Sequence, residues 1–136
     1  MISKPEECSG CPLYELDPNG FIKPEGSGSL GVLIIGEAGG KSERKDGLPF
    51  RFYAQAGSQL ETIIKLAGFQ RQQFRLGNVV NCHPPSDYLA GAPYELEAIE
   101  RCRVHRDRIV NEMKPKCILA LGEIAFRTLT GLCGHK

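Results

Sequence analysis

Short apolar runs alternate along the chain with longer stretches in which apolar residues recur at helical spacing. Residues 32–35, between Gly31 and Gly36, are continuously apolar, which predicts a strand buried on both faces. Residues 77–81 and 117–121 are also predicted to be strands. Strands that are separated by helices form a parallel sheet with helices packed on its faces. We therefore expect a three-layer αβα domain whose ligand lies beyond the carboxyl ends of the strands.

The apolar spacing predicts helices over residues 56–67, 94–113 and 122–130. Pro115 follows the second of these and ends it, because proline cannot continue the helical hydrogen bonding. Residues 41–47 are polar and carry no helical pattern, so they are predicted to form a loop. A sheet of so few strands is small for an α/β fold, and the domain is expected to lack its last strand and helix.

The length and composition are those of one compact domain. The 136 residues, 41% of them hydrophobic, can bury a single core. The formal net charge of +1 excludes a strong general attraction to nucleic acid. The arginines of residues 101–108 are compatible with contact to a DNA backbone or with a solvated helix surface. The start of the chain has no apolar signal run and no stretch is long enough to span a membrane, so a cytoplasmic protein is expected.

Four of the six cysteines suggest a metal site: Cys8, Cys11, Cys82 and Cys102. In an intracellular protein, thiols and metal ligands are more common than a disulfide framework. The first two form a Cys-x-x-Cys pair, and thiolates bind iron–sulfur clusters and zinc alike. Cys117 lies within a predicted strand and is expected to be a small buried residue, whereas Cys133 is expected to be a free thiol.

The loop after the first predicted strand is rich in glycine and continues into Lys41-Ser42. Glycine lets backbone N–H groups approach a ligand closely, and Gly-Lys-Ser invites comparison with a phosphate-binding loop. That motif needs four residues between its glycines, whereas Gly36 and Gly40 enclose three, and no helical pattern begins at Ser42. The sequence therefore favours a glycine-rich turn without a ligand over a nucleotide-hydrolysing loop.

Five segments together with Glu43 resemble the family 4 uracil-DNA glycosylases: residues 36–40, 47–50, 56–57, 78–85 and 115–122. Because they span nearly the whole chain, the resemblance implies the αβα fold of the uracil-DNA glycosylases. It also implies a 4Fe-4S cluster held by the four cysteines named above, and zinc is the alternative that thiolate chemistry leaves open. The implied activity is base excision repair of DNA damage. Uracil in DNA is flipped out of the helix and its N-glycosidic bond is hydrolysed, which leaves an abasic site.

The resemblance also assigns roles in a uracil site. Phe50 would stack on the flipped base, and the Asn78 amide would pair with its polar edge and disfavour cytosine. Glu37 would position water or stabilise positive charge on the sugar. Backbone N–H groups would come from three further substrate-binding residues: Ala38, Gly39 and Gly40. Taken singly, Phe50 and Asn78 also fit a core aromatic and a turn cap, and His83 is assigned no catalytic role.

Three departures from the family pattern bear on activity. Gly39 stands where the first motif usually has proline, which loosens the turn. Residues 51–55 form a longer segment than usual. The sequence ends at Lys136 before the late His-Pro-Ser loop of the family, and His135 has no comparable context.

These features predict one uracil-DNA glycosylase-like domain over residues 1–136. Residues 1–30 are its metal-binding arm and loop, and residues 31–136 its α/β core, expected to be incomplete at the C-terminus. The expected partner is uracil-containing DNA, with a C-terminal segment or another protein supplying the late loop. The alternative function is a catalytically inactive or truncated iron–sulfur DNA-binding relative. A zinc-stabilised nucleotide-binding protein is a third.

Overall fold

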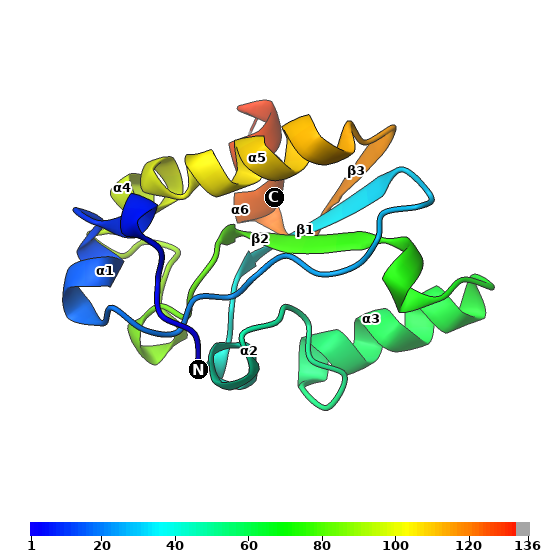
Figure 1. Ribbon diagram of the computed structural model, residues 1–136, viewed down its shortest axis with the longest axis horizontal. Helices are drawn as coiled ribbons and strands as arrows, with labels where there is room; N and C mark the ends of the chain where they lie inside the picture. The colour runs from blue at the N-terminus through cyan, green and yellow to red at the C-terminus, as the bar shows by residue number, and fades with distance from the viewer. Residues whose placement is uncertain (133–136) are drawn as a thin grey trace.

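The centre of the computed structural model is a parallel sheet with the strand order β2-β1-β3 (Figure 1). The structure describes residues 1–132. The strands are β1 (Val32–Ala38), β2 (Arg75–Val80) and β3 (Cys117–Ala120). The register places Gly36 of β1 beside Asn78 of β2. The three predicted strands are therefore confirmed, with β1 and β2 forming the buried part of the sheet.

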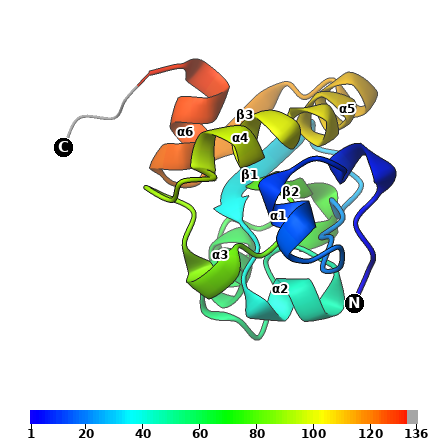
Figure 2. The ribbon, with the colours of Figure 1, turned by 90° about the vertical axis from the view of Figure 1, so that its left-hand side faces the viewer.

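Helices cover both faces of this sheet, so the expected three-layer αβα arrangement is confirmed (Figures 1 and 2). One face carries α3 (Gln55–Leu66). The other carries α4 (Glu95–Arg101), α5 (Arg103–Met113) and α6 (Glu123–Thr130). The chain also forms short 3₁₀ turns: η1 (Glu6–Cys8), η2 (Arg71–Gln73) and η3 (Pro85–Asp87).

Alternate residues of β1 belong to two separate cores. Ile34 packs in one core with Leu60 and Ile64 of α3. Leu33 and Ile35 pack in the other, together with the apolar side of α4 to α6. Successive side chains of a strand point to opposite faces, so a continuously apolar strand contributes side chains to both cores. This position between two cores explains why residues 32–35 are all apolar.

Residues 41–47, predicted to be a loop, contain helix α2 (Lys41–Asp46). The helix is short and polar, so it has no apolar stripe that periodicity would reveal. Its ends are stabilised by caps instead. The Glu43 carboxylate accepts a hydrogen bond from the Gly40 backbone N–H at 3.1 Å, and Gly47 adopts a left-handed φ of 73° just past the last turn.

The single helix predicted over residues 94–113 is two helices, α4 and α5, which meet at Cys102. No glycine or proline marks the junction, and for that reason the sequence does not reveal the break. Cys102 lies at the junction and is buried. The predicted end of the second helix is confirmed, because Lys114 takes a left-handed φ of 48° immediately before Pro115.

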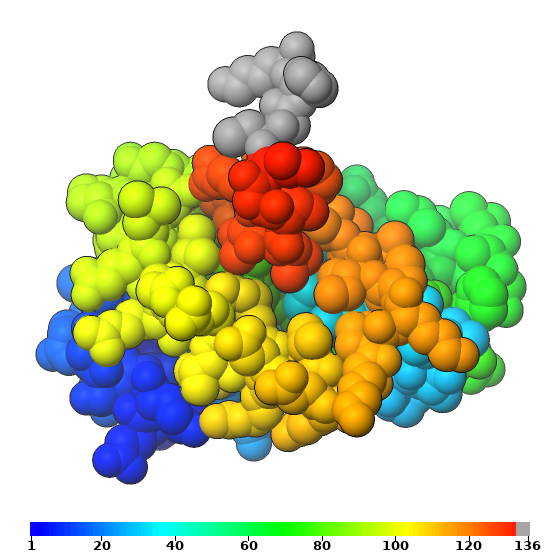
Figure 3. Space-filling view, turned by 90° about the horizontal axis from the view of Figure 1, so that it is seen from above, coloured from blue at the N-terminus to red at the C-terminus, as the bar shows by residue number. Residues whose placement is uncertain are grey.

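Strand β3 is exposed, although the sequence predicted a buried strand. Ile118 and Leu119 are 38% and 46% exposed, and Cys117 is exposed rather than buried as expected. Among the described residues β3 pairs only with β1, so it is an edge of the sheet. Figure 3 shows the orange segment that holds β3 at the surface beside α6. Cys133 lies outside the described residues.

The N-terminal arm runs along β2, where Glu25 forms an isolated antiparallel bridge with Leu76. Its one α-helix, α1 (Pro12–Leu16), packs near α4. Farther along, the Ile22 backbone N–H donates to the carbonyl of Asn81 at 2.9 Å. The arm thereby reaches the residues that follow β2. No helix in residues 1–132 has the length and apolarity that a membrane crossing requires.

Candidate functional site

A cavity of about 500 Å³ lies where β1 and β2 end. Its lining includes all the residues that the sequence analysis assigned to base binding and catalysis: Glu37, Ala38, Gly39, Gly40, Phe50 and Asn78. A second cavity, of about 390 Å³, shares Glu37, Ala38, Phe50 and Asn78 with it. Residues far apart in the sequence meet here because the carboxyl ends of parallel strands lie at one edge of a sheet.

The Phe50 ring and the Asn78 amide converge over Gly36. A Cβ atom at Gly36 would lie 2.6 Å from Cζ of Phe50 and 2.8 Å from Oδ1 of Asn78, so a side chain there would displace both. Asn78 is 3% exposed and lies within β2, not at a turn. It is therefore not the turn cap that it resembles in isolation.

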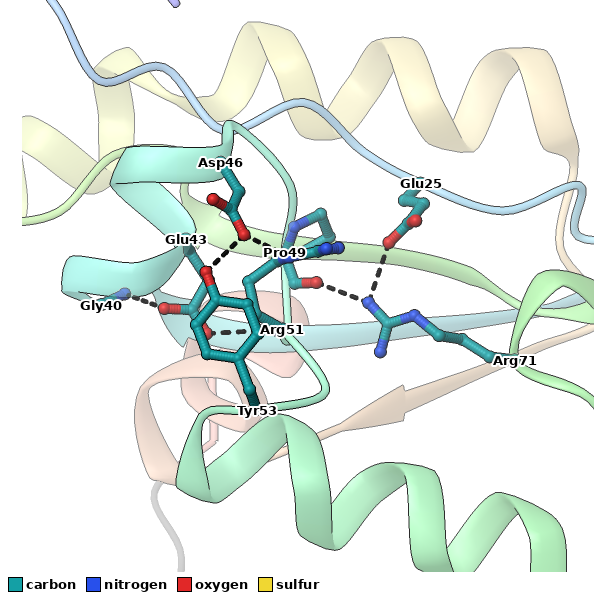
Figure 4. Close-up of polar contacts among 8 residues, drawn as sticks. All are labelled: Glu25, Gly40, Glu43, Asp46, Pro49, Arg51, Tyr53 and Arg71. Atoms are coloured by element: carbon teal, nitrogen blue, oxygen red, sulfur yellow. Dashed lines mark hydrogen bonds and ion pairs between the residues drawn. The ribbon is translucent and has the colours of Figure 1, made fainter. Parts of the chain in front are cut away.

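The backbone of Phe50 is strained and firmly held. Its φ of 46° falls in the left-handed region, which costs a residue with a side chain on the order of 1–3 kcal/mol. On one side the Pro49 carbonyl accepts a hydrogen bond from Nη2 of Arg71 at 2.5 Å (Figure 4). On the other, a Cβ at Gly57 would lie 2.5 Å from the Phe50 carbonyl carbon. The start of α3 therefore packs directly on this loop.

Glu43 joins the glycine loop to the phenylalanine loop. Its carboxylate is buried and accepts hydrogen bonds from the backbone N–H of Gly40 at 3.1 Å and of Arg51 at 3.4 Å (Figure 4). Asp46 adds a second connection, since it accepts from Nε of Arg51 at 2.9 Å and from the Tyr53 hydroxyl. The two loops that line the cavity are thus cross-linked by side chains of α2.

Two of the backbone N–H groups expected to contact substrate already have acceptors. Gly39 donates to the Cys82 carbonyl at 3.2 Å, and Gly40 donates to Glu43. In this conformation both glycines line the cavity without offering an N–H to a ligand. A proline at position 39 would lack the donor, so the glycine that stands there makes a bond that proline cannot.

Glu37 is partly buried at the end of β1. Burial raises the pKa of its carboxyl group above the ordinary value, and the negative charge of Glu95 raises it further. Glu95 accepts a hydrogen bond from Nη2 of Arg127 at 2.6 Å, which fixes its position on α4. At the rim of the cavity, Nε2 of His83 lies 2.7 Å from Oδ1 of Asp87.

The four cysteines of the predicted metal site come together. All are buried free thiols that line one small cavity, of about 10 Å³, under the N-terminal arm: Cys8, Cys11, Cys82 and Cys102. Burial raises the pKa of the Cys8 and Cys82 thiols to about 12. Thiolates at these positions therefore need a compensating cation.

The spacing of these thiols differs from that of a single-ion site. Within residues 1–132, no group of three or more His, Cys, Asp or Glu side chains has the arrangement that would hold one metal ion. A tetrahedral zinc site needs every sulfur about 2.3 Å from the same ion. The four buried thiols nevertheless line one space.

Polar groups surround the thiols. Nε2 of His105 lies 3.4 Å from Sγ of Cys8, and the His105 ring packs against Phe21 with centroids 5.0 Å apart. Lys4 donates from Nζ to two backbone carbonyls of the arm. The side chain of Asn81 is 1% exposed, and neither its Nδ2 nor its Oδ1 has a hydrogen-bond partner.

The arginine-rich segment of residues 101–108 is not a uniform basic face. Arg106 is buried and donates to the carbonyls of Val79 and Ile99, so it holds α5 against β2. Arg108 pairs with Glu7 at 2.8 Å, and Arg103 has acidic neighbours on its own helix. The solvated and structural interpretation of this segment fits better than a DNA-binding stripe.

Three residues that shape these sites were assigned no role from the sequence: Glu43, Arg71 and Asn81. Glu43 follows Gly40 by three positions, which is capping-box spacing and a usable signal. Arg71 carried no signal, because its acceptors Glu25 and Pro49 are brought to it only by the fold. Asn81 was read as part of a motif and not as a polar side chain in the thiol cavity.

The chain is similar to one protein family and to several curated proteins. A family model described as the uracil DNA glycosylase superfamily matches residues 24–136. The chain is 34% identical over 131 residues to a Type-4 uracil-DNA glycosylase of Pyrobaculum aerophilum, which covers 96% of this chain and 63% of that protein. The corresponding enzyme of Sulfurisphaera tokodaii is 34% identical, over 94% of this chain and 56% of its own length. The enzyme of Thermotoga maritima is 31% identical, over 89% of this chain and 59% of its own length. The chain thus spans about three-fifths of the length of these curated relatives.

Proposed function

This chain belongs to the uracil DNA glycosylase superfamily, and we propose that it is a uracil-DNA glycosylase: it takes uracil out of DNA and hydrolyses the N-glycosidic bond, leaving an abasic site. The observation that carries this proposal is the meeting of an aromatic ring, an amide and a carboxylate, those of Phe50, Asn78 and Glu37, in one cavity. An enzyme that acts on a base must extrude it and recognise its edge in such a pocket.

Recognition of uracil would rest on Phe50 and Asn78. The ring offers a flat apolar face for stacking on the base. The amide offers one donor and one acceptor group, which can match a carbonyl and the adjacent N–H of uracil. Cytosine reverses one of these roles and would leave a buried polar group unpaired, which costs about 1–3 kcal/mol. The turn formed by Ala38, Gly39 and Gly40 would close the pocket around the base by shape.

Glu37 would act on the sugar side of the scissile bond. Glycosidic cleavage develops positive charge on the sugar, which a nearby carboxylate stabilises, and the same carboxylate can orient the attacking water. Both roles need the charged form of Glu37. Because burial and Glu95 raise the pKa of this group, its charge and the rate would be lost at a higher pH than for an ordinary glutamate as the solution is acidified.

Substitution of Glu95 by glutamine is expected to shift the acidic limb of the pH–rate profile to lower pH. Removing the Glu95 charge lowers the pKa of Glu37, while glutamine still accepts a hydrogen bond from Arg127. The measurement is the initial rate of uracil release as a function of pH. Glu97→Gln, at an exposed position of the same helix, is the matched control and should leave the limb in place. If the acidic limb lies at the same pH in Glu95→Gln and Glu97→Gln, ionisation of Glu37 does not set the pH dependence of the rate.

We further propose that Cys8, Cys11, Cys82 and Cys102 hold a 4Fe-4S cluster. The donor set fits, because four buried free thiols share one cavity and an unpaired amide lies among them. When bound, the cluster would supply a cross-link between the arm of residues 1–30 and the α/β core of residues 31–136, which then form one domain. Thiolates also bind zinc, and analysis for iron, sulfide and zinc separates the two. The cytoplasm, where thiols stay reduced, suits such a site.

The test of the function is uracil release from a single-stranded oligonucleotide that contains one uracil, by protein purified anaerobically. The same oligonucleotide with cytosine in place of uracil is the control. Release from the uracil substrate alone supports the proposal. Folded, iron-loaded protein that binds DNA in a salt-sensitive way without releasing uracil would instead identify an iron–sulfur DNA-binding relative.

A further inference from the structure

Asn81 places an unpaired amide in the wall of the thiol cavity. It directly precedes Cys82, is 1% exposed, and has no hydrogen-bond partner at either side-chain polar atom. Its neighbours in the cavity wall are the four cysteines and mainly apolar side chains. A buried amide without partners is unfavourable, so such a group in a folded protein calls for a ligand that completes its hydrogen bonds.

The backbone carbonyl of the same residue is used by the arm, because it accepts a hydrogen bond from the Ile22 backbone N–H at 2.9 Å. The side-chain amide of Asn81 has no such partner.

His105 provides a second donor, next to the Cys8 thiol. It lies on α5 and is buried, with Nε2 3.4 Å from Sγ of Cys8. Contact with Phe21 fixes the plane of its ring. When Cys8 is a thiolate, it has no proton to donate, so Nε2–H of His105 must be the donor.

We propose that Asn81 and His105 are positioning residues for the iron–sulfur cluster: the Asn81 amide and the His105 imidazole donate hydrogen bonds to cluster or cysteine sulfur and raise its reduction potential. This inference rests on the cluster proposed above. Reduction adds one electron, and so negative charge, to the sulfur-rich group. N–H donors stabilise the reduced form more than the oxidised form, and hydrogen bonds to the sulfurs are among the factors that set the potential of such clusters.

The test is a redox titration of the loaded protein with dithionite, followed by electron paramagnetic resonance. Asn81→Leu keeps the size of the side chain and removes its N–H groups. We expect it to make one-electron reduction about tenfold less favourable, a potential lower by about 59 mV. His105→Leu should shift the potential in the same direction, and His105→Gln, whose amide keeps an N–H, should restore part of the difference.

Matched controls separate this role from a structural one. Asn111→Leu makes the same replacement at an exposed position of α5 and should leave the potential unchanged. Each variant is first analysed for iron and sulfide, so that potentials are compared only between equally loaded proteins. Unchanged potentials in loaded Asn81→Leu and His105→Leu would overturn the inference and leave the cluster in place. If the wild-type protein holds no iron and sulfide after reconstitution, the cluster proposal itself is wrong. Uracil release is measured separately and tests the glycosylase function.

Discussion

Asn78→Ala is expected to lower the rate of uracil release by at least about 100-fold, the usual cost of losing one pre-positioned hydrogen-bonding group in an active site. The amide lies at the floor of the cavity, close to the Phe50 ring over Gly36, and is almost fully buried. Alanine leaves that position without a group that can pair with the base edge. The measurement is single-turnover release from the uracil oligonucleotide.

Two observations keep this result interpretable. Asn111→Ala, on the exposed side of α5, should release uracil at the wild-type rate. Asn78→Ala should retain the iron content and melting temperature of the wild type, because its side chain lines a cavity and its removal opens no new space in either core. A wild-type rate in a folded Asn78→Ala protein would remove this residue from base recognition.

Cys82→Ser is expected to lose bound iron and to lower the melting temperature by at least about 10 °C, because metal binding contributes to folding free energy where the site forms only in the folded chain. Cys82 follows β2 and is one of the four proposed ligands that would tie the arm to the core. The hydroxyl of serine replaces a thiolate that a soft iron site prefers. Iron content and thermal unfolding are measured on the same preparation.

Cys117→Ser is the natural comparison, because Cys117 is an exposed free thiol on the edge strand. It should leave both the iron content and the melting temperature unchanged. If Cys82→Ser keeps its iron and has the melting temperature of the wild type, the proposal that the four cysteines hold a cluster is wrong. If Cys117→Ser loses iron as well, the loss reflects general damage to the fold.

The strands and most helices could be predicted because each is encoded over a few neighbouring residues. The apolar run at residues 32–35 marks a strand that faces two cores, and the apolar spacing of residues 56–67 marks α3. Helix α2 was missed because caps at Gly40 and Gly47 stabilise it, not an apolar stripe. The break at Cys102 was missed because no glycine or proline marks it.

The sequence by itself determined the chemistry that this protein can carry: the four thiols, the ring of Phe50, the amide of Asn78 and the carboxylate of Glu37. Tertiary structure alone decided which groups are available. In the folded chain the N–H groups of Gly39 and Gly40 donate to internal acceptors, whereas the side-chain amide of Asn81 has no hydrogen-bond partner. Tertiary structure also exposes β3, although its residues are as apolar as those of a buried strand. The physical reason is that residue type and local periodicity are properties of neighbouring positions, whereas burial and hydrogen-bond partners depend on segments far apart in the chain.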